Sequence, residues 1–227
     1  MKKFNTIIFD LDGTLTDPAE EIIQAAKYAL TNAGKKISTS GELKVFLTKP
    51  LLQCFERNYG MSLQEANQAF VQYWHYAGSF GVGFNKPYSG VCDLIRTLSE
   101  NNIKLAIATA RPEKNAIQIL KACKIAQYFD VIAGALDDRT RPSKKWVVFD
   151  TLCMLGDVDP EKALMVGDRY ADIDGANCNG MKSMGVTFGQ ETLTEVRRAK
   201  PDYLVTSPEQ MCENLLKLTG SCLANVQ

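Results

Sequence analysis

Two aspartates, Asp10 and Asp12, stand close together directly after a short apolar run, Thr6–Phe9. The run is continuously apolar and rich in β-branched residues, which predicts a buried strand of a parallel sheet. The aspartates therefore come where this strand ends, at the edge of an α/β sheet where ligands bind. Placing two carboxylates there costs free energy unless a cation or a reacting group neutralises them. The spacing favours a metal site or a reactive carboxylate, with a plain turn as the alternative.

A calcium-binding loop also begins with Asp-x-Asp-Gly, and Glu21 falls where such a loop ends. However, Leu15 stands where that loop requires glycine, and a strand rather than a helix precedes Asp10. We therefore do not expect a calcium loop.

Further polar signals follow other predicted strands. One apolar run ends in Thr109-Ala110-Arg111, Asp168 and Asp172 follow another, and Lys144 begins a predicted helix between them. Because the carboxyl ends of parallel strands meet at one edge of a sheet, we expect these residues to converge with the first two aspartates. Several carboxylates suit Mg²⁺, and a hydroxyl and a lysine suit phosphate oxygens. One carboxylate is left to attack phosphorus, with a neighbour able to move a proton.

The elements that must position these residues alternate between strand and helix. Such alternation predicts an α/β fold, a Rossmann-like doubly wound parallel sheet with helices on both faces. Residues 16–85 instead show helical patterns, at 43–58 and 63–76 among others, and no strand. We therefore predict a core of residues 1–15 and 86–227 with an inserted helical domain of residues 16–85. Further strands are expected at 104–109, 129–133, 163–167, 184–188 and 203–205.

Composition narrows the possible functions. The 26 basic and 26 acidic side chains balance and form no block of like charge, so neither a nucleic-acid polymer nor a membrane is the expected partner. Seven scattered cysteines and one histidine argue against a structural zinc site or a disulfide framework, and favour a reducing, cytoplasmic location. A small molecule is the expected partner, and a monomer and a homodimer both remain open.

Four segments, taken together, resemble in order and spacing the motifs of the haloacid dehalogenase-like phosphohydrolases. They are Asp-Leu-Asp-Gly-Thr at 10–14, Ala-Thr-Ala-Arg at 108–111, a lysine ahead of a helix, and Gly-Asp-Arg-x-x-Asp at 167–172. The most similar branch contains phosphoglycolate phosphatase and related nucleotidases and carries a helical cap after the first motif. The resemblance implies that Asp10 is a nucleophile that forms an aspartyl-phosphate. It also implies that Asp12 protonates the leaving oxygen and then activates water.

The same resemblance implies a phosphoryl site and a metal site. Thr109, the backbone amide of Ala110 and a lysine would bind the phosphoryl group. Mg²⁺ would be held by Asp10, Asp168 and the backbone carbonyl of Asp12, while Asp172 would orient waters or the lysine.

Two segments depart from the family pattern. The lysine motif reads Arg-Pro-Ser-Lys-Lys at 141–145, so either Lys144 or Lys145 is the functional residue, and the helical register favours Lys144. In the cap, relatives carry Gly-Pro-Pro-Leu where this chain has Thr-Lys-Pro-Leu at 48–51. Lys49 is therefore either a contact for an anionic substrate or an exposed surface lysine.

The predicted function is hydrolysis of a small phosphorylated metabolite, resembling phosphoglycolate or a nucleotide, by a Mg²⁺-dependent phosphatase. A phosphomutase of the same superfamily is one alternative, although no extra histidine or lysine near the cap start supports it. A catalytically idle binding or regulatory protein is the other. An idle site would have no need to retain so many costly charges.

Overall fold

The computed structural model describes residues 3–136, 143–190 and 193–222. The chain forms two compact units, here called the core unit (Met1–Asp17 and Pro87–Gln227) and the insert unit (Pro18–Lys86). The sequence predicted the boundaries after residues 15 and 85, and the structure has them after Asp17 and Lys86. The junctions contain two short strands that the sequence pattern did not predict, β2 (Thr16–Asp17) and β3 (Lys86–Pro87), which pair with each other.

A six-stranded sheet forms the centre of the core unit, in the order β5-β4-β1-β6-β7-β8. All five pairs of neighbouring strands in this sheet are parallel, and the predicted α/β fold is therefore confirmed. The central strands are buried along their whole length, which explains their continuous apolar runs. The strands are β1 (Thr6–Phe9), β4 (Lys104–Pro112), β5 (Val131–Ala135), β6 (Ala163–Gly167), β7 (Lys182–Val186) and β8 (Tyr203–Val205).

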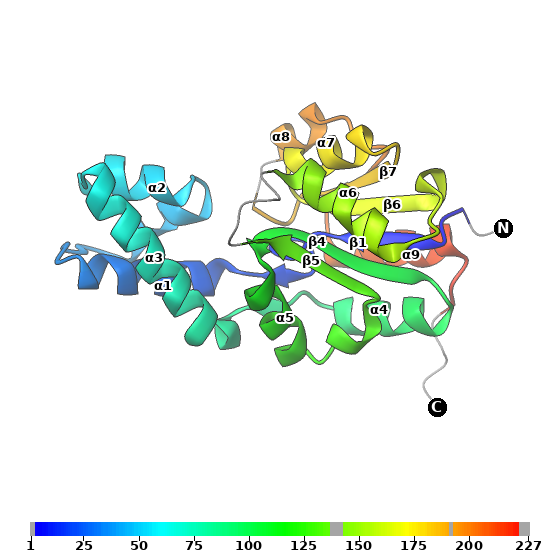
Figure 1. Cartoon of the computed structure of the whole chain (residues 1–227), viewed down its shortest axis with the longest axis horizontal. Helices are drawn as coiled ribbons and strands as arrows, with labels where there is room; N and C mark the ends of the chain where they lie inside the picture. The colour runs from blue at the N-terminus through cyan, green and yellow to red at the C-terminus, as the bar shows by residue number, and fades with distance from the viewer. Residues whose placement is uncertain (1–2, 137–142, 191–192, 223–227) are drawn as a thin grey trace. The chain divides into compact units, whose positions relative to one another are not determined.

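Helices cover both faces of this sheet. Figure 1 shows α6 (Lys144–Leu155) and α7 (Tyr170–Cys178) on one face and α4 (Val91–Glu100) and α5 (Glu113–Ala122) on the other. α8 (Leu193–Arg198) lies near α7, and α9 (Pro208–Thr219) packs against α4. Below α6 and α7 the sheet presents small side chains, which let the helices approach closely. The buried cluster there includes Ile8, Ala106, Ala108, Ala133, Val147, Val148, Met165 and Ala176.

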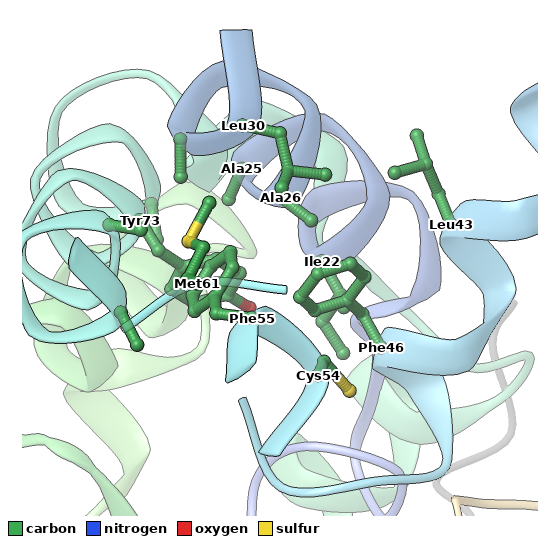
Figure 2. Packing of buried hydrophobic residues seen from close by; sticks show 14 residues of the cluster. Ile22, Ala25, Ala26, Leu30, Leu43, Phe46, Cys54, Phe55, Met61 and Tyr73 are labelled. Atoms are coloured by element: carbon green, nitrogen blue, oxygen red, sulfur yellow. The ribbon is translucent and has the colours of Figure 1, made fainter. Parts of the chain in front are cut away.

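The insert unit is helical and has its own apolar core, with Phe46, Phe55 and Tyr73 among the buried side chains (Figure 2). Its longest helix, α3 (Leu63–Ser79), begins with a capping box. The Ser62 side chain accepts the N–H of Glu65, and the Glu65 carboxylate accepts the N–H of Ser62. The unit comprises α1 (Ala19–Asn32), a 3₁₀ segment (Ser40–Leu47), α2 (Leu51–Gln53), a π-helical turn (Cys54–Asn58), α3 (Leu63–Ser79) and a second 3₁₀ segment (Gly81–Phe84).

The structure corrects several predicted boundaries. The helix expected over 43–58 is broken at Pro50, whose ψ of 134° is extended and whose ring removes a backbone donor. Strands expected at 129–133 and 184–188 lie at Val131–Ala135 and Lys182–Val186. In the part of the chain that the structure describes, no helix is long and apolar enough to cross a membrane.

Candidate active site

The loop after β1 places Asp10 at the carboxyl edge of the sheet. The carbonyl of Leu11 accepts the N–H groups of Thr14, Leu15 and Thr16, which closes a tight turn. Gly13 has a φ of +86°, a conformation that side chains with a Cβ rarely adopt. A Cβ at Gly13 would also lie 2.3 Å from Oδ2 of Asp168. The glycine therefore permits both the turn and the approach of a distant aspartate.

Lys144, the first residue of α6, reaches this edge from the helix side. Its Nζ lies 2.5 Å from Oδ1 of Asp10 and 2.6 Å from Oδ1 of Asp172. Lys144 is buried, whereas Lys145 is exposed. The geometry thus brings Lys144 rather than Lys145 to the aspartates. Arg141, in the same motif, lies outside the described residues.

Three buried carboxylates gather around this point. Asp10, Asp168 and Asp172 each offer an oxygen, and these oxygens all lie within 4.8 Å of one another. Oδ2 of Asp168 accepts the backbone N–H of Gln190 at 2.5 Å, while its Oδ1 is buried and has no hydrogen-bond partner among the described residues. An unpartnered buried carboxylate oxygen is costly unless something binds it. The cluster could therefore hold a metal ion.

The electrostatics of the cluster favour a cation. Burial raises the pKa of Asp10 from 3.8 to about 6 against the opposing effect of Lys144, and neighbouring carboxylates add to the rise. Burial, together with Asp10 and Asp172, holds the pKa of Asp168 well above its usual value. Burial alone would lower the pKa of Lys144, but Asp10 and Asp172 outweigh it and raise that pKa. The cluster thus carries an excess of carboxylates, and a divalent cation would stabilise their ionised forms.

The second motif supplies a hydroxyl in the carboxyl-terminal part of β4. Thr109 is buried, and its Oγ1 accepts the backbone N–H of Arg111 at 3.2 Å. A hydroxyl that accepts one bond can still donate its own proton to an anion. Ala110, next to it, is exposed. Lys49 is an exposed residue of the insert unit.

The side chain of Asp12 contacts Arg111, a residue to which the sequence analysis assigned no role. The Arg111 guanidinium binds its carboxylate in a bidentate manner, with Nε 2.7 Å from Oδ2 and Nη2 2.8 Å from Oδ1. The side chain of Asp12 is thus directed toward Arg111, while the family resemblance assigns only its backbone carbonyl to the metal. A basic residue at the end of the strand that carries Thr109 was the signal that could have indicated this contact.

Comparisons with known proteins agree with this fold. Residues 7–186 match the haloacid dehalogenase-like hydrolase family. A 5′-nucleotidase of Pseudomonas aeruginosa is 33% identical over 201 residues, which cover 88% of this chain and 90% of that protein. A crystal structure from Clostridium difficile, described as a candidate phosphatase, has a TM-score of 0.88 and 35% identity and covers 95% of this chain and 100% of that one.

A third relative is named as a kinase rather than as a phosphatase. The tyrosine-protein kinase PtkA of Mycobacterium tuberculosis is 36% identical over 183 residues, which cover 81% of this chain but 62% of the kinase. Much of that kinase thus lies outside the match, and its activity is not carried over to this chain.

The chain belongs to the haloacid dehalogenase-like hydrolase family. Within that family it is a phosphatase, as its similarity to the 5′-nucleotidase and to the Clostridium difficile structure supports.

Proposed function

We propose that this phosphatase hydrolyses a small phosphomonoester with the help of Mg²⁺ and through an aspartyl-phosphate on Asp10. The observation that carries the proposal is the cluster itself. Three buried carboxylates lie within 4.8 Å of one another at the carboxyl edge of the sheet, and Lys144 contacts two of them. So many buried charges are costly, and a site that binds a metal ion and a phosphoryl group uses all of them.

In the first half-reaction, a carboxylate oxygen of Asp10 attacks phosphorus and forms a P–O bond while the ester P–O bond breaks. The electron pair of the broken bond goes to the leaving oxygen, which takes a proton from the carboxylic acid of Asp12. Lys144 and the hydroxyl of Thr109 stabilise negative charge on the phosphoryl oxygens. The products are the free alcohol and an aspartyl-phosphate.

In the second half-reaction, water attacks the phosphorus of the aspartyl-phosphate. The Asp12 carboxylate takes a proton from that water, and the bond between phosphorus and Asp10 breaks. Inorganic phosphate leaves, and both aspartates regain their starting states. Asp12 thus acts first as acid and then as base.

Asp10, Asp168 and the backbone carbonyl of Asp12 would hold the metal ion. A bound Mg²⁺ would neutralise negative charge on the phosphoryl oxygens. Asp172 accepts the backbone N–H of Arg169 at 3.0 Å and contacts Lys144, and so it keeps the lysine in place.

The proposed substrates are small phosphorylated metabolites, resembling phosphoglycolate or a nucleotide. The similarity to a 5′-nucleotidase supports a nucleotide, rather than a phosphoglycolate-like compound, as the substrate. The core unit offers contacts to the phosphoryl group, so discrimination between leaving groups is expected to come from the insert unit, where Lys49 is a candidate contact.

The experiment that tests this proposal combines Asp10→Asn with a screen of phosphorylated metabolites. With Mg²⁺ the parent should release phosphate, and EDTA should stop the release. Asp10→Asn should remain folded, lose turnover and take up no label from ³²P-substrate, whereas the parent should become labelled on Asp10. The exposed Asp93→Asn is the matched control and should behave like the parent. Turnover in Asp10→Asn close to that of the parent would refute the mechanism.

A further inference from the structure

Arg111 and Asp12 form a bidentate ion pair that is largely buried. Two parallel N–H···O bonds of 2.7 and 2.8 Å join the two side chains. The Arg111 side chain is only 3% exposed and that of Asp12 is 19% exposed. A bidentate guanidinium fixes the plane of a carboxylate as well as its position, which a lysine cannot do.

A bulge in β4 gives Arg111 this direction. On β4 the pairing steps from Ala108 to Pro112, while on β5 it steps only from Ala133 to Ala135. The extra residues on β4 include Arg111, and bulges of this kind redirect side chains beside active sites.

The facing strand is adapted to the bulge. A Cβ on Gly134 would lie 2.6 Å from the carbonyl oxygen of Arg111 and 2.7 Å from Cα of Glu113. Contacts that short do not occur for real Cβ atoms, so β5 approaches the bulge this closely because residue 134 is glycine. Both strands therefore contribute to the placement of Arg111.

Stability alone is a poor explanation for this pair. An exposed pair such as Arg96–Asp93 contributes little to stability, because water screens the two charges. A buried pair loses hydration that its attraction often fails to recover, so burial adds no clear advantage for folding. Orientation of one partner is the property that a buried, bidentate contact supplies.

We propose that Arg111 is a positioning residue for Asp12. Its guanidinium holds the Asp12 carboxyl group in the orientation from which a proton passes to the leaving oxygen and is later taken from water. Arg111 itself forms no bond to the reacting atoms in this proposal, which rests on the acid–base role proposed above for Asp12.

A series of leaving groups tests the proposal, because a basic leaving oxygen needs the proton of Asp12 far more than an acidic one. For alkyl phosphates, Arg111→Gln should lower kcat by about 10–100-fold with little change in KM. For p-nitrophenyl phosphate the loss should be under about threefold. Arg111→Lys keeps the positive charge but cannot form the bidentate contact, so its kcat should lie between those of Arg111→Gln and the parent. The control Arg96→Gln should have the kcat of the parent.

Two outcomes would overturn the proposal. An equal loss across all leaving groups would mean that Arg111 binds the phosphoryl group or merely supports the fold. In the Asp12→Asn variant, adding Arg111→Gln should cause no further loss of kcat for alkyl phosphates. If the double variant instead loses the product of the two single losses, Arg111 does not act through Asp12.

A readout without turnover separates this proposal from the proposed function. The side-chain carboxyl ¹³C signal of Asp12, assigned by its loss in Asp12→Asn, should shift and broaden in Arg111→Gln and stay unchanged in Arg96→Gln. An unchanged signal in Arg111→Gln overturns the positioning role. If the signal responds while the parent cleaves no phosphate ester, the proposed function fails and the orientation of Asp12 by Arg111 stands.

Discussion

Replacement of Lys144 by methionine is a perturbation for which the structure predicts a large loss of stability. The ammonium is buried and lies 2.5 Å from Asp10 and 2.6 Å from Asp172. Methionine keeps most of the apolar stem but leaves the carboxylates without that cation. The neighbouring Lys145 is exposed, so Lys145→Met is a matched control with the same change of side chain.

The expected magnitude follows from the charges that remain. Removing one partner of a buried ion pair costs about 3–5 kcal/mol, because the other charge stays buried and uncompensated. Even with Lys144 present, the pKa of Asp10 is raised from 3.8 to about 6. Near pH 7.5 the variant must therefore keep a poorly stabilised carboxylate ionised or protonate it. Near pH 5 Asp10 already carries a proton for much of the time, and the loss should fall to roughly half.

Urea unfolding at pH 7.5 and pH 5, in EDTA and without substrate, measures the free energy of unfolding of each variant. We expect Lys144→Met to lose about 3–5 kcal/mol at pH 7.5 and Lys145→Met to lose under about 0.5 kcal/mol. If both variants unfold at the same urea concentration, the buried contacts of Lys144 do not exist in solution and the reasoning is refuted.

Three further predictions concern the metal, pH and the substrate. Asp168→Asn should raise the Mg²⁺ concentration needed for half-maximal thermal stabilisation by about tenfold or more, and an unchanged titration would remove Asp168 from the metal site. Because the folded-state pKa of Asp10, about 6, lies above its ordinary value of 3.8, this residue favours folding more as pH falls from about 6 to 4. The thermal midpoint gained from Mg²⁺ should accordingly be larger at pH 7.5 than at pH 5, and an equal gain at both would contradict this. Lys49→Ala should lower kcat/KM for anionic leaving groups by a factor that corresponds to about 1–3 kcal/mol, and should hardly change it for p-nitrophenyl phosphate. Lys44→Ala, at another exposed lysine, is the control. An equal effect on both substrate classes would show that Lys49 does not determine specificity.

The sequence alone determined the alternation of elements and the ends of β1 and β6, whereas β4 extends to Pro112, beyond the predicted end at residue 109. A continuously apolar run must be buried on both faces, and a polar residue directly after it must lie where the strand leaves the sheet. That is why Asp10 and Asp168 could be assigned to one edge although they belong to different strands. Local patterns were weaker in the insert unit, where Pro50 breaks what the apolar spacing indicated as one helix.

Tertiary structure decided which side chains actually meet. Lys144 and Asp10 are 134 residues apart, and the choice between Lys144 and Lys145 depends on which face α6 turns toward the sheet. The contact between Arg111 and Asp12 spans 99 residues and depends on a bulge whose close packing requires Gly134 on the next strand. Such contacts arise from how separate strands pair and from where backbones can approach, and no pattern within one segment encodes them.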